Sequence, residues 1–154
     1  LIAEYRGEVS FEPPSISTLE RFSYGNDRDA TYKKRLRDSG LSAIAGKKER
    51  NVVINQLRLK GSFDDVIRHP DGGFCVFEFK TCDGFIFQKL QEPMPGHVQQ
   101  IAAYMAATAL HRGVILYESK GSGHPKRAFW IDWDAALWEG IAARLRRLRV
   151  EAEA

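Results

Sequence analysis

The segment from Phe74 to Gly84, FCVFEFKTCDG, constrains the fold of this chain more than any other stretch. Its aromatic and β-branched residues predict a buried β-strand, and side chains on a strand alternate between two faces. The odd-numbered residues from Cys75 to Phe79 therefore share one face, and Glu78 and Lys80 share the other. Two opposite charges on an apolar strand are costly to bury unless they are offset by each other, by a metal ion or by a bound phosphate.

Glu78 and Lys80 have a simpler interpretation, as a charged pair on a solvent-exposed face of the sheet. Charged residues two positions apart commonly decorate the water-facing side of an antiparallel sheet. The choice between a solvated pair and a functional pair depends on what the rest of the chain brings to that face.

Composition predicts one globular domain over residues 1–154. The chain has 154 residues, 44% of them hydrophobic and 28% charged, which is typical of a soluble protein with one core. No apolar run approaches the roughly 20 residues that span a bilayer, so no membrane partner is expected. Cys75 and Cys82 are too few for a disulfide framework, and the first ten residues lack the apolar segment of a secretory signal. These features indicate a reducing, cytoplasmic compartment.

Positive charge is distributed in clusters, although the formal net charge is only +3. Each cluster alone is most simply a solvated surface, and five together favour a surface that binds phosphate groups. The clusters span residues 32–37, 46–50, 57–61, 124–127 and 144–149.

Mixed helical and strand patterns follow one another along the chain without repeats. Ser17-x-x-Glu20 predicts the start of a short helix near Thr18, and Asn26 or Asp27 predicts the cap of a second helix that ends at Gly40. Strands are expected over 51–61, 61–69, 74–81, 114–119 and 127–133, and helices over 96–113 and after Asp132 or Asp134. This order predicts an α/β fold with a mixed β-sheet flanked by α-helices.

The turn HPDGG at residues 69–73 is expected to join two of these strands into a hairpin, which brings the segment GSFDD close to the charged pair. Asp64 or Asp65 can then approach Glu78 from the neighbouring strand. Two converging carboxylates repel unless a cation lies between them, and Mg²⁺ takes such oxygens at about 2.1 Å. We therefore expect Mg²⁺ or Mn²⁺ as the cofactor, with Lys80 supplying a positive charge beside a reacting phosphate.

Three short motifs occur in order on these elements: Gly61-x-x-Asp64, Glu78-x-Lys80 and Gln100-x-x-x-Tyr104. In this set the chain resembles the PD-(D/E)XK nuclease superfamily, in particular its RecB-like group, which includes phage exonucleases. The resemblance spans about residues 52–118, and the corresponding catalytic core covers about residues 49–118. It implies a restriction-endonuclease-like fold.

The resemblance assigns a role to each residue of the first two motifs. Asp64 and Glu78 match the metal-binding carboxylates, and the backbone carbonyl of Phe79 matches a third metal ligand. Lys80 matches the lysine that positions the attacking water or stabilises the transition state. Asp65 is left pointing to the opposite face, as a charge at a strand edge or turn.

The helix motif adds supporting residues. His97, Gln100 and Tyr104 share one stripe of the expected helix because they are three and four residues apart. The resemblance implies that Gln100 and Tyr104 face the active site, whereas His97 is equally well explained as a residue of the helix start. Relatives carry a further carboxylate on an upstream helix, for which Glu49 and Glu20 are the candidates. Cys75 and Cys82 cannot supply the four-cysteine cluster site of some relatives.

The three tryptophans Trp130, Trp133 and Trp138 lie around the last expected strand and helix. They could stack on unpaired bases, but their alternation with aliphatic residues favours packing in the core.

Together these features predict a metal-dependent DNA nuclease, expected to be an exonuclease of phage or prokaryotic recombination, replication or repair. The absence of room for a base-reading domain favours DNA ends or single strands as the substrate. Three alternatives stay open: a structure-specific or nonspecific endonuclease, a non-catalytic nucleic-acid-binding module of the same fold, and RNA as the substrate. Homo-oligomerisation and binding to a replication or recombination partner are also left open.

Overall fold

The computed structural model describes residues 16–44 and 51–154, with the backbone alone for residues 16–24 and 26. Its helices are α2 (Ile16–Asp38), the 3₁₀ turn η1 (Asn55–Leu57), α3 (Gly84–Lys89), α4 (Pro95–Thr108) and α5 (Ala135–Glu153). Its strands are β1 (Asn51–Ile54), β2 (Leu59–Ser62), β3 (Asp65–Arg68), β4 (Phe74–Cys82), β5 (Arg112–Ser119) and β6 (Lys126–Asp132). No helix within these ranges combines the length and the apolar character that a bilayer span requires.

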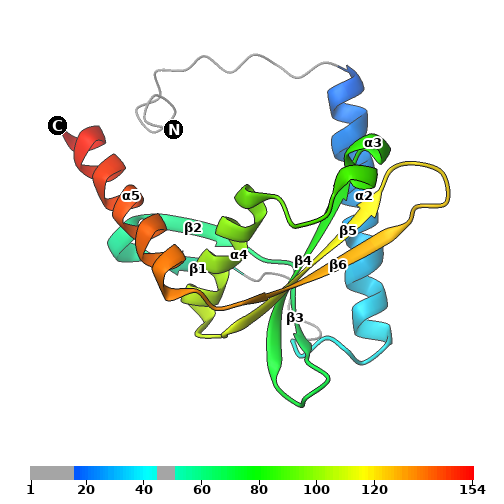
Figure 1. Ribbon diagram of the computed structural model, residues 1–154, viewed down its shortest axis with the longest axis horizontal. Coiled ribbons are helices and arrows are strands. Elements are labelled where there is room, and N and C mark those ends of the chain that lie inside the picture. Colours follow the sequence, from blue (N-terminus) through cyan, green and yellow to red (C-terminus); the bar gives the residue numbers. More distant parts are fainter. Residues whose placement is uncertain (1–15, 45–50) are drawn as a thin grey trace.

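A mixed sheet forms the centre of the molecule, in the order β3-β4-β5-β6. The central pair β4 and β5 is parallel, because α3 and α4 carry the chain back between them, and the two outer pairs are antiparallel. Figure 1 shows α2 along one side of this sheet, with α4 and α5 on the other side. The expected mixed sheet flanked by helices is confirmed.

The alternation of β4 separates two apolar cores. Its odd-numbered side chains, from Cys75 to Phe79, pack with Tyr32 and Leu36 of α2. On the other face, Val76 and Cys82 pack with residues of α3, α4 and β5. Because Glu78 and Lys80 lie between Val76 and Cys82 in the alternation, they emerge on the side of α4, as the sequence predicted.

The two expected N-terminal helices are one continuous helix, and in this respect the prediction was wrong. α2 runs through Gly25, Asn26 and Asp27 without a break. Gly25 passes close to the sheet, since a Cβ at this position would lie 3.5 Å from the Thr81 hydroxyl. Packing along the sheet outweighs the local capping preference of Asn26 and Asp27, because tertiary contacts routinely override such propensities.

The long strand expected over 51–61 is a hairpin with its own two-stranded sheet. β1 pairs antiparallel with β2, and the chain turns through η1 and Arg58, whose φ of 49° is left-handed. The segment expected as one strand over 61–69 is likewise divided between β2 and β3. This hairpin lies against α4, so it carries Gly61 to the site described below rather than extending the main sheet.

Two further differences concern the segment between β4 and β5. Helix α3 was not predicted; Asp83 starts it by accepting a hydrogen bond from the Phe85 amide. Helix α4 ends at Thr108, and Gly113 belongs to β5 rather than to the helix stop. A Cβ at Gly113 would lie 2.5 Å from Cδ1 of Ile101, so the glycine lets α4 pack directly on the sheet.

The C-terminal elements agree with the sequence, apart from one tryptophan. Asp134 starts α5 by accepting a hydrogen bond from the Leu137 amide. Trp133 packs against the core on the side of α4, and Trp138 is partly buried. Trp130 is 54% exposed on β6, where its ring meets His69 edge-on, so the core interpretation was wrong for this residue.

Candidate active site

The β3–β4 hairpin brings Asp64 to Glu78. The register pairs Asp65, the first residue of β3, with Phe77. Asp64, which immediately precedes β3, therefore lies beside the residues that follow Phe77 on β4. There Asp64 Oδ2 accepts a 2.7 Å hydrogen bond from the Phe79 amide, the kind of contact that another strand would otherwise make. The carboxylate is thus fixed at the edge of β4, beside Glu78.

Glu78 is a buried acid with an unsatisfied oxygen. The residue is 3% exposed, which rules out the water-facing interpretation for this side chain. Its Oε2 lies 3.1 Å from Lys80 Nζ, and its Oε1 has no hydrogen-bond partner among the described residues. Burial, with a further contribution from the charge of Asp64, raises the pKa of Glu78 to about 7, although Lys80 opposes this shift. A buried oxygen of this kind is costly without a ligand or a proton.

Lys80 is held in place by the helix motif. Its Nζ donates to Gln100 Oε1 at 2.7 Å, and Gln100 Nε2 donates to the Tyr104 hydroxyl at 3.0 Å. Burial first, and then the charge of Glu78, raises the pKa of Tyr104. The structure therefore joins Glu78, Lys80, Gln100 and Tyr104 in one continuous chain of contacts.

Gly61, the glycine of the first motif, lies close to Tyr104 at the end of this series of contacts. A Cβ at Gly61 would lie 3.0 Å from Cε1 of Tyr104 and 3.4 Å from its hydroxyl oxygen. β2 can approach the tyrosine ring this closely only because position 61 has no side chain.

Helix α2 contributes two residues that sequence reasoning missed. Lys33 Nζ lies 2.6 Å from Asp29 Oδ2 and 3.1 Å from Asp64 Oδ1. Burial raises the pKa of Asp29, against the lowering effect of Lys33. The spacing of Asp29 and Lys33 is the available sequence signal, but Lys34 and Asp38 have the same spacing and form a pair exposed to solvent. Spacing alone therefore could not single out Asp29.

Five of these residues, namely Asp29, Asp64, Glu78, Lys80 and Gln100, line a cavity of about 550 Å³ at the edge of β4, whereas Gly61 and Tyr104 line a neighbouring one with Gln100. Helices α2 and α4 both contribute to the lining of the first cavity, α2 through Gly25 and Asp29 and α4 through Gln100. The residues that line it are Gly25, Asp29, Ser62, Asp64, Glu78, Phe79, Lys80, Thr81, Gln100 and Lys120.

The remaining predicted residues lie elsewhere. Asp65, expected at a strand edge or turn, is the first residue of the outer strand β3, but it is fully buried rather than a surface charge, and its Oδ1 accepts a 2.9 Å hydrogen bond from the Ser42 hydroxyl. His97 Nδ1 lies 2.7 Å from the Tyr117 hydroxyl at the start of α4, and burial, with Lys80, lowers its pKa. Glu49 and the side chain of Glu20 lie outside the described residues.

Several basic residues that were expected to bind phosphate are engaged within the protein. Arg127 donates to the carbonyls of Phe87 and Leu90, and Lys126 lies 3.5 Å from the buried Glu118. Arginines 146, 147 and 149 on α5 pair with glutamates of the same helix. The cluster over 46–50 lies outside the described residues. The lysines that border the cavity are Lys80 and Lys120, with Lys33 contacting Asp29 and Asp64 of its lining.

The donor set fits a hard divalent cation. Asp64 and Glu78 offer carboxylate oxygens at one cavity, and the buried Glu78 Oε1 lacks a protein partner among the described residues. Over residues 16–44 and 51–154, no three acidic, histidine or cysteine side chains form a closed metal cage. Mg²⁺ is usually held by one or two carboxylates and completes its shell with water and substrate oxygens, and Asp64 and Glu78 could supply two such carboxylates.

Comparison with protein-family models and with curated proteins finds no match. Solved structures do match. The crystal structure of LHK-Exo in complex with dAMP has a TM-score of 0.67 at 15% identity, with 99% of this chain and 85% of that chain covered. A crystal structure of LHK-Exo, an alkaline exonuclease from Laribacter hongkongensis, has a TM-score of 0.58 at 15% identity, covering 99% and 75% of the two chains.

The crystal structure of SSO0001 has a TM-score of 0.57 at 16% identity and covers 90% of this chain, which spans 60% of the length of that chain. At these identities the similarity concerns the course of the backbone. The chain therefore has a fold shared with LHK-Exo and SSO0001, and a shared fold does not by itself determine function.

Proposed function

We propose that this chain is a metal-dependent nuclease that hydrolyses phosphodiester bonds in DNA, with an exonuclease as the preferred form. The observation that carries the proposal is the buried Glu78, which lies beside Asp64, has one oxygen without a partner in the described part of the chain, and has Lys80 Nζ at 3.1 Å from its other oxygen. The shared fold with an alkaline exonuclease supports it, as does the dAMP present in one of the LHK-Exo structures.

Asp64 and Glu78 would hold Mg²⁺ or Mn²⁺, with the carbonyl of Phe79 as a further ligand. When bound, the metal would supply a Lewis acid for the scissile phosphate and the attacking water. The hydrogen bond from the Phe79 amide orients Asp64, and burial restricts Glu78, so both carboxylates are placed before the cation binds.

Lys80 supplies the positive charge for the reaction. Hydrolysis forms a bond from the water oxygen to phosphorus and breaks the bond to the leaving nucleotide oxygen, and negative charge accumulates on the phosphate oxygens between these events. Gln100 fixes Lys80 Nζ through its amide oxygen, and Tyr104 fixes the amide through its nitrogen. A charge that is oriented in advance stabilises such a transition state without reorganisation.

The preferred substrate is a DNA end or a single strand. Arg127 and Lys126, outside the cavity, are used in contacts within the protein. We therefore expect the lysines near the cavity to bind DNA through its sugar-phosphate backbone. Backbone contacts carry no sequence information, so selectivity is expected to come from the shape or the terminus of the substrate.

Matched linear and covalently closed circular DNA, each single- and double-stranded, would be incubated with the protein and Mg²⁺. We expect the linear molecules to be degraded faster, with no degradation by Glu78→Gln and normal degradation by Glu139→Gln, a change at an exposed glutamate of α5. Equal cleavage of the circles would contradict the exonuclease and support an endonuclease. Binding without cleavage would support a non-catalytic module, and cleavage restricted to matched RNA would contradict the choice of DNA.

A further inference from the structure

Lys33 lies between two carboxylates that border the proposed metal site. Its Nζ is 2.6 Å from Asp29 Oδ2 and 3.1 Å from Asp64 Oδ1. Burial alone would lower the pKa of Lys33, but its hydrogen bonds and its attraction to the two acids outweigh burial and raise it. The ammonium group of Lys33 lies within ion-pair distance of both acids, beside the proposed metal site.

Lys33 satisfies only one oxygen of Asp29. Asp29 Oδ1 is buried and has no hydrogen-bond partner among the described residues, and the same holds for Glu78 Oε1. With every group ionised, the carboxylates of Asp29, Asp64 and Glu78 and the two ammonium groups that contact them, those of Lys33 and Lys80, sum to a charge of minus one. Without Lys33 the same cluster would carry minus two. Lys120, which also borders the cavity, is outside this set of contacts and is the same in every variant below.

The neighbouring pair on the same helix shows what is particular to Lys33. Lys34 and Asp38 are also four residues apart and 2.5 Å from each other, but their side chains are 70% and 60% exposed. The side chains of Lys33, Asp29 and Asp64 are 29%, 30% and 16% exposed. Only the Lys33 pair is continued into the cavity, through Asp64.

We infer that Lys33 is an internal counter-ion of the metal site: it holds Asp64 in place in the metal-free protein, and it lowers the affinity of the site for the divalent cation. The inference rests on the proposed function, because it assumes that Asp64 and Glu78 bind the metal. Lys33 is a positioning residue in this role, since it acts on the metal through Asp64.

Opposite charge changes at Asp29 and Lys33 should then have opposite effects. Lys33→Met removes a positive charge next to the cation and should tighten Mn²⁺ binding by about tenfold, on the basis of the Coulomb energy of a unit and a divalent charge in a largely aqueous cavity. Asp29→Asn removes a negative charge and leaves Lys33 to Asp64 alone, so Mn²⁺ should bind more weakly. The double variant should return to near the wild-type affinity, since its net charge is again minus one.

Calorimetric titration with Mn²⁺ would give these affinities without any substrate, with Lys34→Met as the matched control that should stay within about twofold of wild type. Thermal unfolding in EDTA and in Mn²⁺ gives a second measurement. Lys33→Met should unfold at a lower temperature than wild type in EDTA and should gain more from Mn²⁺.

Weaker or unchanged Mn²⁺ binding by Lys33→Met would overturn the counter-ion role, as would a change in the same direction for Lys33→Met and Asp29→Asn. If Asp64→Asn abolishes binding while Lys33→Met leaves it unchanged, the metal site stands and only the role of Lys33 fails. If no variant and no wild-type protein binds Mn²⁺, the metal site itself fails, and the role of Lys33 fails with it.

Discussion

Gly61 and Tyr104 are in contact across the candidate active site, so two motifs that are far apart in the sequence depend on each other. The ring of Tyr104 occupies the space in which a side chain at position 61 would lie, at 3.0 Å from its Cε1 atom. Since Tyr104 accepts the hydrogen bond that orients Gln100, and Gln100 accepts from Lys80, the glycine acts on the lysine through two intermediates.

Gly61→Ala should lower DNA cleavage by displacing Tyr104 by a few tenths of an ångström. We expect a loss of about tenfold or more, because small misplacements of oriented groups are costly in rate. Gly140→Ala is the control: a Cβ there meets no atom, and alanine favours the helix by about 0.5–1 kcal/mol. Cleavage rates and unfolding free energies of both variants would be compared, and full activity in Gly61→Ala would show that the contact has no role in positioning.

Glu78→Gln and Lys80→Met should separate metal binding from catalysis. Glu78→Gln should lose both Mn²⁺ binding and cleavage, since it removes a carboxylate ligand. Lys80→Met should lose cleavage by about 10²–10³-fold and retain Mn²⁺ binding, because it removes only a charge that faces the transition state. The two properties would be measured on the same preparations. A Lys80→Met variant that cleaves at the wild-type rate would refute the role of this lysine.

The metal-free protein should become less stable as the pH rises towards neutrality. The pKa of Glu78 is about 7 in the folded protein, above the value of about 4.3 for an exposed glutamate, so between these values the folded state binds more protons than the unfolded state. The contribution of Glu78 is therefore fully present at the lower pH and is lost as the pH rises through about 7.

Urea unfolding in EDTA from about pH 5 to about pH 8 would measure this effect. Glu78→Gln should have a flatter profile than wild type, because its amide does not titrate. His97 acts in the opposite sense, since its pKa is lowered, but it is present in both proteins and cancels in the comparison. Parallel profiles for the two proteins would argue against a raised pKa at Glu78.

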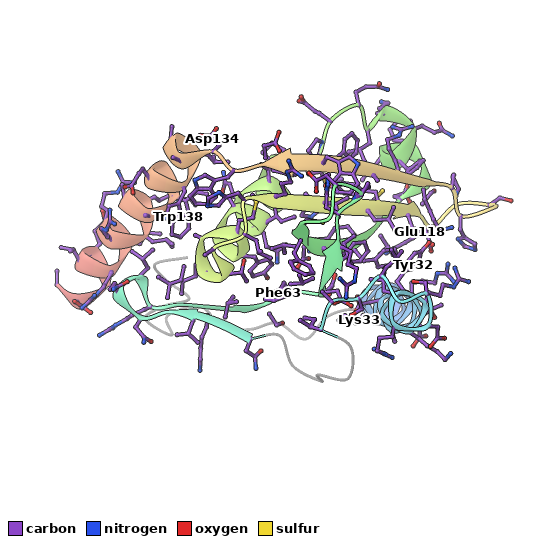
Figure 2. The ribbon with its side chains drawn as sticks, turned by 90° about the horizontal axis from the view of Figure 1, so that it is seen from below. Tyr32, Lys33, Phe63, Glu118, Asp134 and Trp138 are labelled. Carbon is purple, nitrogen blue, oxygen red and sulfur yellow. The ribbon has the colours of Figure 1, made fainter. Side chains whose placement is uncertain are left out.

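Glu118 should be important for stability although it lies outside the cavity. It is fully buried and accepts hydrogen bonds from Arg28 at 2.6 and 2.8 Å, which fasten α2 to β5. Figure 2 shows Glu118 above α2, with Tyr32 between this helix and the sheet. Burial would raise the pKa of Glu118, but Arg28 and Lys126 outweigh this effect and hold the pKa below its usual value.

Removing one partner of a buried ion pair leaves the other charge uncompensated, so Arg28→Met should lower the unfolding free energy by about 3–5 kcal/mol. Lys126→Met should cost much less, because Lys126 is 37% exposed and lies at 3.5 Å. Denaturant unfolding of both variants would test this difference. Equal losses would mean that Arg28 is not the main partner of Glu118.

The sequence predicted the parts of the site that depend on short-range geometry. Alternation along β4 placed Glu78 and Lys80 on one face, and the hairpin brought Asp64 or Asp65 beside them. Helical spacing joined Gln100 to Tyr104. Each of these relationships is determined by the period of a strand or helix, or by the register of one turn. Between the two aspartates, the resemblance of Gly61-x-x-Asp64 to a known motif then selected Asp64.

What the sequence could not supply depends on packing between distant elements. The Lys33 pair and the Lys34 pair have the same spacing, and only the position of α2 against the sheet distinguishes them. Gly113 was predicted to end a helix because glycine is common at that position. Its actual role, to leave room for Ile101 of α4 against β5, depends on how the helix packs on the sheet and has no signal in the local sequence. Asp65 was predicted to be a charge at a strand edge or turn. Its carboxylate instead pairs with Ser42, which is 23 residues away, so the local sequence carries no signal of its burial.

The unequal lengths of β3 and β4 have a consequence for self-association. β3 has four residues and ends its pairing at Phe77, so the rest of the nine-residue β4 has no strand neighbour on that side within the described part of the chain. An overhang of this kind invites a strand from a second molecule. Asp64 already occupies the Phe79 amide, and α2 passes beside Thr81. Asp64, the proposed metal ligand, thus also hinders the pairing of β4 with a strand of a second molecule. Its replacement is expected to lower solubility as well as cleavage.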